Sequence, residues 1–350
     1  MSQVYLKRGT YQEFLTHPQK VLDGIKKSGF LKDVKKDEFV GLKIHFGEKG
    51  NKSHIHPDLL SPLARFFRKR GARAFLFDTN TLYRGERTNS VDHIRIANKH
   101  GFSKLDMPVI IGDGLRGNDY YHVKYNQKNF KDFYLAQILK DIDFMLVFSH
   151  FTGHMLTGFG AAIKNIGMGC ASRRGKLAQH CVLSPNIKEE QCIKCGMCAK
   201  VCPADAISEG KDAFFIDSKK CIGCAQCISV CPVGAVKISW SESYNEMAEK
   251  MVEYAYAATQ NRKCAYVNFC TYITKECDCM NKEKNGFVED LGVLFSWDPV
   301  SIDKASIDLL LQREKHDVLK DAHPNINYLN HLEYANKIGL GELEYKLTEI

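Results

Sequence analysis

A twelve-residue pattern of cysteines occurs twice in this chain and constrains its fold more than any other feature. The pattern reads CIKCGMCAKVCP at residues 192–203 and CIGCAQCISVCP at residues 221–232, beginning 29 positions later. Both copies have the spacing C-x₂-C-x₂-C-x₃-C-P, so the region is an internal duplication. In a chain of 350 residues with 14 cysteines, two such regular runs indicate metal ligation in a reducing compartment rather than a disulfide framework.

The spacing of the thiols indicates how they are shared between two metal centres. Three thiolates that lie two residues apart on a tight loop can hold three irons of one cubane, whereas the fourth cysteine points to the other cubane. The proline after it has no amide hydrogen and a fixed backbone torsion, which helps to end that geometry. We therefore expect two [4Fe–4S] clusters, the first held by Cys192, Cys195, Cys198 and Cys231 and the second by Cys202, Cys221, Cys224 and Cys227.

Zinc binding is the alternative interpretation, because C-x₂-C pairs also ligate zinc. Zinc sites rarely need the third C-x₂ step, the Cys-Pro pair and the duplication together, so the pattern favours iron–sulfur clusters. A strand-like segment follows each run, at 213–217 and at 236–239. Residues 188–240 resemble the bacterial two-cluster ferredoxin domain, with every ligand position filled. The resemblance implies one-electron transfer over a short distance.

Short apolar segments alternate with amphipathic ones on both sides of the cysteine runs. We expect strands at 39–45, 74–77, 108–111, 143–148, 264–269 and 291–295. We expect helices at 18–28, 57–70, 90–100, 131–140, 241–258 and 299–312. Buried strands separated by helices predict an α/β fold with a layered, mainly parallel sheet.

The resumption of this alternation after the cysteine runs predicts the domain organisation. We expect residues 1–187 to form the first part of one α/β domain and residues 241–350 to complete it. Residues 188–240 would then be an inserted α+β module of the ferredoxin type. The alternative is three separate domains in a row.

Polar side chains follow four of the expected strands at the point where each strand ends. Any one of them alone fits a turn or a helix cap. Ligands of open α/β sheets bind beyond the carboxyl ends of the strands, so four such segments together favour a shared cleft. The candidate cleft residues are His45, Glu48, Asp78, Asn80, Asp113, Arg116, His150 and His154.

A glycine-rich segment offers a candidate anion site. Gly158 and Gly160 precede an expected helix, where free backbone amides attract anions. Arg173 and Lys176 follow in the same stretch and can neutralise an acidic ligand. We therefore predict phosphate or carboxylate binding here, with close backbone packing as the alternative role of the two glycines.

The six remaining cysteines include one closely spaced pair, Cys277 and Cys279. Positions two apart face the same side of an extended chain, so both thiols can hold a third metal or form a redox-active disulfide. The alternative is a pair of half-buried thiols without chemistry. That alternative is favoured for two other cysteines, which sit in or beside an apolar run, Cys264 and Cys270. The other two are Cys170 and Cys181.

Several segments together are similar to the uncharacterised domain-of-unknown-function family numbered 362, in its ferredoxin-containing form. The similarity implies an iron–sulfur protein with an α/β body, and the family supplies no settled substrate or reaction. The segments are KIHFGEKGN (43–51), DTNTLYRGER (78–87), DGLRG (113–117), SHFTGH (149–154), GFGAAIKNIGMGCASRRGK (158–176), CDC (277–279) and DPVSIDKAS (298–306).

These observations predict an oxidoreductase whose clusters exchange electrons with a small anionic ligand in the cleft. Histidines near neutral pKa can move the accompanying protons, and Arg116 would orient the anion. One alternative is a non-catalytic electron carrier that docks a redox partner protein. The other is a metallocofactor-assembly or sulfur-handling protein that uses Cys277 and Cys279.

Other classes of function are not expected. No window approaches 18 apolar residues and the N-terminus lacks the features of a secretory signal, so we expect a cytoplasmic protein without a membrane span. The basic run at 65–70 fits the solvated face of a packing helix, so nucleic-acid binding is not expected despite a formal charge of +8. We find no dinucleotide fingerprint, which argues against nicotinamide or flavin.

Overall fold

The structure is a computed structural model that describes the whole chain except residues 84, 181–183, 239–243 and 281–284. Its centre is an eight-stranded sheet with the strand order β16-β1-β15-β14-β7-β2-β3-β4. Strand β15 is antiparallel to both neighbours, and the other adjacent pairs are parallel. The predicted α/β class with a mainly parallel sheet is therefore confirmed. The strand bounds are β1 Ser2–Lys7, β2 Phe39–Ile44, β3 Arg73–Asp78, β4 Val109–Ile111, β7 Phe144–His150, β14 Lys263–Cys270, β15 Gly292–Ser296 and β16 Tyr345–Glu349.

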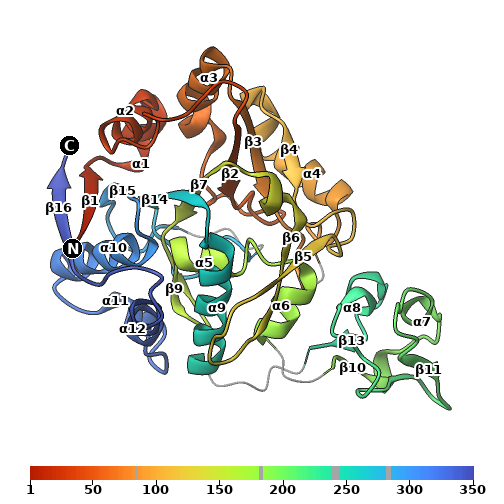
Figure 1. Cartoon of the computed structure of the whole chain (residues 1–350). Coiled ribbons are helices and arrows are strands. Elements are labelled where there is room, and N and C mark those ends of the chain that lie inside the picture. Colours follow the sequence, from red (N-terminus) through yellow and green to blue (C-terminus); the bar gives the residue numbers. More distant parts are fainter. Residues whose placement is uncertain (84, 181–183, 239–243, 281–284) are drawn as a thin grey trace.

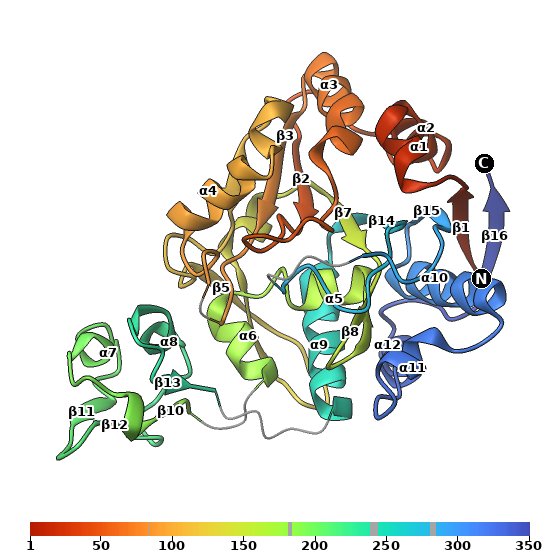
Figure 2. The same ribbon diagram turned by 180° about the vertical axis from the view of Figure 1, so that it is seen from behind.

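Helices cover both faces of this sheet (Figures 1 and 2). One face packs against α1 (Tyr11–Thr16), α2 (Gln19–Lys27), α3 (Ser61–Arg70) and α4 (Ser90–Lys99). The other face packs against α5 (Ala162–Gly167), α9 (Tyr244–Thr259), α10 (Pro299–Glu314), α11 (Val318–Ala322) and α12 (Leu329–Lys337). The described residues also contain the 3₁₀ helices η1 (Pro57–Leu60), η2 (Phe102–Leu105), η3 (Gln137–Asp141) and η4 (Glu189–Gln191).

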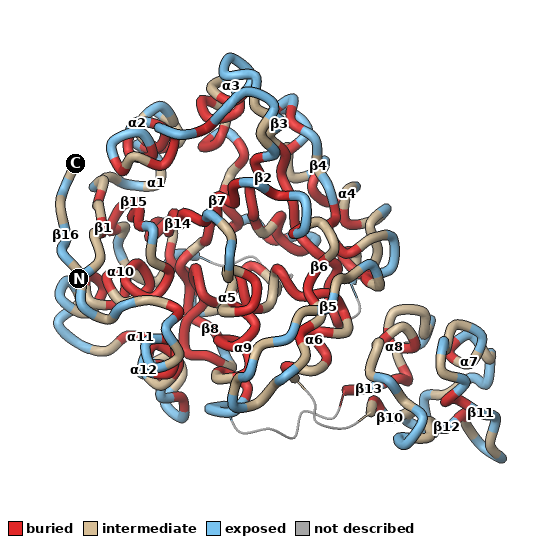
Figure 3. Tube along the Cα trace, in the orientation of Figure 1, coloured by how far each residue is buried: buried red, intermediate tan, exposed pale blue. Residues whose placement is uncertain are grey.

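Strand β7 illustrates why the central strands are apolar throughout. Successive side chains of a strand point to opposite faces, and here both faces are covered. Phe144, Leu146 and Phe148 belong to the core beneath α1–α4. Met145 and Val147 belong to the core beneath α5, α9 and α10. In Figure 3 the residues coloured as buried accordingly run through the middle of the sheet.

Segments on both sides of the cysteine runs pair in this one sheet. Strand β14 lies beside β7 in parallel, and β1 lies between β15 and β16. The intervening segment instead contains α7 (Met197–Lys200), α8 (Gln226–Val230) and the two-stranded pairs β10 (Asn186–Ile187) with β13 (Val236–Lys237) and β11 (Ile207–Glu209) with β12 (Phe214–Ile216). Figures 1 and 2 show this segment to one side of the large sheet, near α6 (Arg173–His180).

One predicted helix is wrong. Residues 131–140 form β6 (Asp132–Ala136) and then η3, and β6 pairs with β5 (Tyr120–Lys124). Phe133 and Leu135 are buried while the residues between and before them are half-buried, which is the two-residue period of a strand. A second small pair joins β8 (Thr152–His154) to β9 (Gly158–Gly160).

The other predicted elements lie within a few residues of the observed ones. Of the helix expected at 241–258, the part from Tyr244 onward is described as α9. Residues 241–243, together with Ser239 and Cys181, lie outside the described residues. In the described part of the chain, we find no helix with the length and apolar character needed to cross a membrane.

Candidate functional site

A cavity of about 320 Å³ lies at the carboxyl ends of β2, β3 and β7. This is the edge at which ligands of open α/β sheets bind. Four of the predicted cleft residues line it, namely His45, Asp78, His150 and His154. The wall also contains charged and polar side chains that the sequence did not single out for the cleft, among them Lys43, Tyr83, Arg87, Lys164 and Asp278.

The other four predicted cleft residues do not reach the cavity. Glu48 lies behind its wall, with Oε2 3.2 Å from Nε of Arg87. Asn80 and Asp113 bind each other, because Asp113 Oδ1 accepts from both the backbone amide and Nδ2 of Asn80 at 2.8 Å. Burial raises the pKa of Asp113 to about 6. Arg116 is exposed and does not line the cavity, so the structure does not bring it to the other predicted cleft residues.

A buried ion pair stands at the floor of the cavity. Nζ of Lys43 lies 2.9 Å from Oδ1 of Asp78, and both side chains are less than 5% exposed. Burial alone would raise the pKa of Asp78, but Lys43 and His93 hold it well below its usual range. Burial and the nearby Arg87 guanidinium keep the pKa of His45 well below its usual range. The floor therefore combines an ionised carboxylate with a neutral imidazole.

Lys164 is the principal residue that sequence reasoning missed. It lies on α5, its side chain lines the cavity, and burial lowers its pKa to about 8. Among the described residues, no hydrogen bond or ion pair of its amine is found, in contrast to the paired Lys43. Its position in the sequence could have pointed to the cavity, because this lysine falls in the first turn of the helix that follows the glycine-rich segment.

The amides at the start of α5, which were predicted to bind an anion, already have an acceptor within the protein. The amides of Ala162 and Ile163 donate to the two carboxylate oxygens of Asp303, each at 2.9 Å. An internal carboxylate from α10 thus takes the place expected for an anion. Gly158 and Gly160 form β9, and Gly158 adopts a φ of 76°.

The two cations predicted for this anion have different surroundings. Arg173 is fully buried and donates to the carbonyl oxygen of Thr88. Burial lowers the pKa of Arg173 to about 10, while the nearby Asp113 and Cys224 act in the opposite direction. Lys176 does line the cavity, and it donates to the carbonyl oxygen of Ala171 at 2.7 Å.

The segment Cys277-Asp278-Cys279 forms part of the cavity wall and is held on several sides. The carboxylate of Asp278 accepts from Ser53 Oγ at 2.7 Å and lies 2.9 Å from His150 Nδ1. Its backbone carbonyl accepts from the amide of Glu48 at 3.1 Å. The two sulfurs are joined as a disulfide. A ring nitrogen of His154 and these two sulfurs all lie within 4.8 Å of one another.

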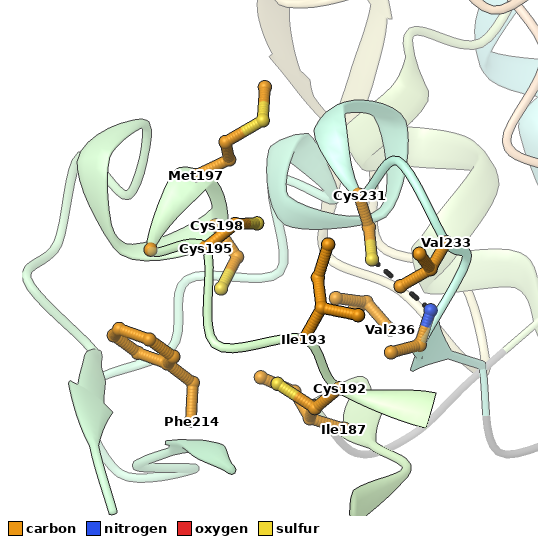
Figure 4. A pocket seen from close by; sticks show the side chains of 12 residues that line it. Ile187, Cys192, Ile193, Cys195, Met197, Cys198, Phe214, Cys231, Val233 and Val236 are labelled. Carbon is orange, nitrogen blue, oxygen red and sulfur yellow. Dashed lines mark hydrogen bonds between the residues drawn. The ribbon is translucent and has the colours of Figure 1, made fainter. Parts of the chain in front are cut away.

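The eight cysteines of the duplicated pattern line two further pockets. One is lined by Cys192, Cys195, Cys198 and Cys231, and Figure 4 shows these side chains around one space together with Ile193 and Phe214. The other is lined by Cys202, Cys221, Cys224 and Cys227. In each pocket the cysteine contributed by the other run accepts a backbone amide: Cys231 Sγ from Ala235 at 3.1 Å and Cys202 Sγ from Ala206 at 3.3 Å.

The spacing within these pockets bears on the zinc alternative. A tetrahedral zinc site with Zn–S bonds of about 2.3 Å places its sulfurs about 3.8 Å apart. Throughout the described residues, no three of the eight thiols have sulfurs that all lie within 4.8 Å of one another.

Comparisons with known proteins yielded a match to one family model and limited likenesses to solved structures. The family model described as Domain of unknown function (DUF362) matches residues 40–308. No curated protein matches the chain.

Two of the solved structures that resemble this chain are longer, and the chain spans just over half of each. The lactate racemase apoprotein from Thermoanaerobacterium thermosaccharolyticum has 14% identity and a TM-score of 0.42, over 78% of this chain and 51% of that one. A structural-genomics target from Thermotoga maritima has 11% identity and a TM-score of 0.41, over 91% of this chain and 59% of that one. With TM-scores below 0.5, neither likeness supports an activity for this chain.

Proposed function

The chain belongs to the DUF362 family, and from that premise we propose that it is an iron–sulfur redox protein that exchanges electrons with a small anionic ligand in the cavity. Residues 188–240 would be a ferredoxin-like insertion into one α/β domain formed by residues 1–187 and 241–350. A redox partner protein would supply or accept the electrons.

The donor set of the two cysteine pockets supports the cluster assignment. Each pocket offers four thiols, and its other lining residues are largely apolar, such as Ile193 and Phe214 in one and Ile207 and Ile216 in the other. Apolar surroundings and amide donors to sulfur are the means by which proteins tune iron–sulfur centres. When bound, two [4Fe–4S] clusters supply one-electron transfer at low potential.

One side chain belongs both to the cavity wall and to the apolar cluster around the cysteine pockets. Leu82 lines the cavity and also belongs to the apolar cluster that contains Cys198, Ala225 and Cys227. Leu177 of α6 joins the same cluster. The cysteine segment therefore shares an apolar cluster with the cavity wall, which supports a short path for electrons between the two.

The charge of the cavity wall favours an anionic ligand. Besides His150, which pairs with Asp278, four cationic side chains line it, Lys43, Arg87, Lys164 and Lys176, against the carboxylates of Asp78 and Asp278. Lys43 pairs with Asp78, Arg87 pairs with Glu48, and Lys176 donates to the carbonyl oxygen of Ala171. Lys164 therefore supplies the cation that is available to a ligand. A non-catalytic carrier would not require such a cavity, which is why the enzyme interpretation is preferred.

The proposal is tested on full-length protein purified and reconstituted without oxygen. We expect about eight irons and eight inorganic sulfides per chain. After reduction with dithionite, a panel of small carboxylates and phosphate esters with reducible groups is screened for reoxidation of the clusters. Lys164→Met should slow reoxidation by an active compound, while the exposed Lys99→Met serves as the matched control. Colourless, iron-poor protein or equal rates in both variants would overturn the proposal.

A further inference from the structure

We propose that reduced Cys277 and Cys279, together with His154, form a binding site for one zinc-like divalent metal ion on the cavity wall. Their three potential ligand atoms lie within 4.8 Å of one another. No other trio of His, Cys, Asp or Glu side chains in the described ranges is gathered this closely. The site is separate from the eight thiols of the duplicated pattern and does not depend on the clusters that they are proposed to hold.

The chemistry of the three donors selects the kind of metal. Two thiolates and one imidazole form the donor set of catalytic zinc sites that keep their fourth position open. Soft sulfur ligands disfavour magnesium and calcium, which prefer oxygen. All three residues line the cavity, so the fourth position faces the space in which a ligand would bind.

The loop that carries the two sulfurs is fixed before any metal arrives. Asp278 stands between them, and its carboxylate is engaged by Ser53 and His150 rather than turned to the metal position. The hydroxyl of Tyr83 donates to the carbonyl oxygen of Cys279 at 3.2 Å. Such supporting contacts orient metal ligands and strengthen binding. These hydrogen bonds therefore hold the backbone between the two sulfurs in place before a metal binds.

His154 is oriented in the same way. The backbone amides of Leu156 and Thr157 donate to its Nδ1 at 3.3 and 3.2 Å, and the hydroxyl of Thr157 lies 2.8 Å from the same nitrogen. The hydroxyl of Thr157 in turn donates to the carbonyl oxygen of Phe159 at 2.6 Å. These contacts fix the ring and occupy Nδ1, so Nε2 is the nitrogen left for a metal. Metal binding there would move the ring hydrogen to Nδ1, where the hydroxyl of Thr157 can accept it.

Redox state decides whether the site is available. With the sulfurs joined as a disulfide, neither is a thiolate ligand. A phosphine such as TCEP reduces the bond with two electrons, and two protons from water complete the two thiols while the phosphine becomes a phosphine oxide. Binding of the divalent ion then releases two protons as the thiols become thiolates. The site thus exists only in the reduced protein.

The test uses the full-length, cluster-loaded protein, treated with TCEP and zinc chloride without oxygen and then passed over a desalting column. We expect one zinc per chain by mass spectrometry of the metals, with iron content unchanged. Zinc-edge X-ray absorption should show two sulfurs at about 2.3 Å and nitrogen or oxygen at about 2.0 Å. The Cys277→Ser/Cys279→Ser variant should lose this zinc and keep its iron, whereas Cys264→Ala, a thiol buried elsewhere in the core, should keep both.

A second variant guards against misfolding of the first. His154→Gln retains both sulfurs and should weaken zinc binding by roughly tenfold or more, measured by competition with a chelator. Equal zinc in the double-serine variant, or four sulfurs around zinc in the wild type, would overturn the inference. Iron content decides the proposed function and zinc content decides this site, so failure of one is distinguishable from failure of the other.

Discussion

His150 lies 2.9 Å from Asp278, through Nδ1 and Oδ2, and both side chains are about 5% exposed. The Nε2 atom of His150 faces the carbonyl oxygens of Thr271 and Tyr272 at 3.1 and 3.2 Å. Carbonyl and carboxylate oxygens only accept, so both ring nitrogens carry hydrogen and the ring is cationic. Although burial opposes it, Asp278 raises the pKa of His150. A buried ion pair thus ties the end of β7 to the loop that carries Cys277 and Cys279.

The first prediction concerns this ion pair. Asp278→Asn should lower the free energy of unfolding by about 3 kcal/mol, because it leaves a buried charge without its partner. The matched change at an exposed pair, Asp37→Asn opposite Arg73, should cost less than about 1 kcal/mol. Urea titration of both variants measures the difference. An equal decrease in the free energy of unfolding in both variants would show that the buried ion pair stabilises the protein no more than an exposed one.

The second prediction contrasts two lysines of the same cavity. Lys43→Met should destabilise the protein by about 3 kcal/mol, because Asp78 keeps its charge and loses its closest cation. Lys164→Met should be neutral or stabilising, because it removes a buried cation for which no partner is found among the described residues. Thermal unfolding at neutral pH measures both. A larger loss for Lys164→Met would mean that its amine has a structural role.

The location of the site was predictable because it depends on strand direction. Parallel strands that end in polar residues must present them at one edge, and this rule brought His45, Asp78, His150 and His154 together. The same rule failed for Arg116, because a side chain several residues beyond a strand follows its loop and not the sheet. The thiols grouped by spacing line common pockets, while the clusters themselves stay a prediction.

Features that depend on distant partners were not predictable. The amides of α5 looked free in the sequence, but their acceptor, Asp303, comes from a helix about 140 residues later. The edge strand β16 was missed because its residues are half-buried or exposed, and its pairing with β1 joins the two ends of the chain. Local pattern carries no information about such contacts.

The third prediction concerns acid stability and His331. This ring is buried against Phe159, and burial lowers its pKa from 6.5 to about 3. The unfolded chain binds the proton below pH 6.5 while the folded chain does not, so stability falls as pH falls from 6.5 toward 3. The slope from this group is at most about 1.4 kcal/mol per pH unit. His331→Leu should make the free energy of unfolding, measured by urea titration, fall less steeply between pH 7 and 4. The exposed His17→Leu should leave that fall unchanged. The same slope in the wild type and both variants would contradict this assignment.

The last prediction concerns Arg173, whose buried charge interacts with the thiol of Cys224. Reduction adds negative charge to a cluster, so a cation held nearby in a poorly solvated position favours the reduced state. Arg173→Met should therefore lower the reduction potential of one cluster and leave the other nearly unchanged, as followed by electron paramagnetic resonance during a redox titration. Arg173→Lys should restore most of the potential, and Arg174→Met is the matched control, because that guanidinium stacks on Tyr134 at 3.8 Å. Unchanged potentials in Arg173→Met, or the same shift in Arg174→Met, would mean that the cluster proposed at Cys224 does not lie against this arginine.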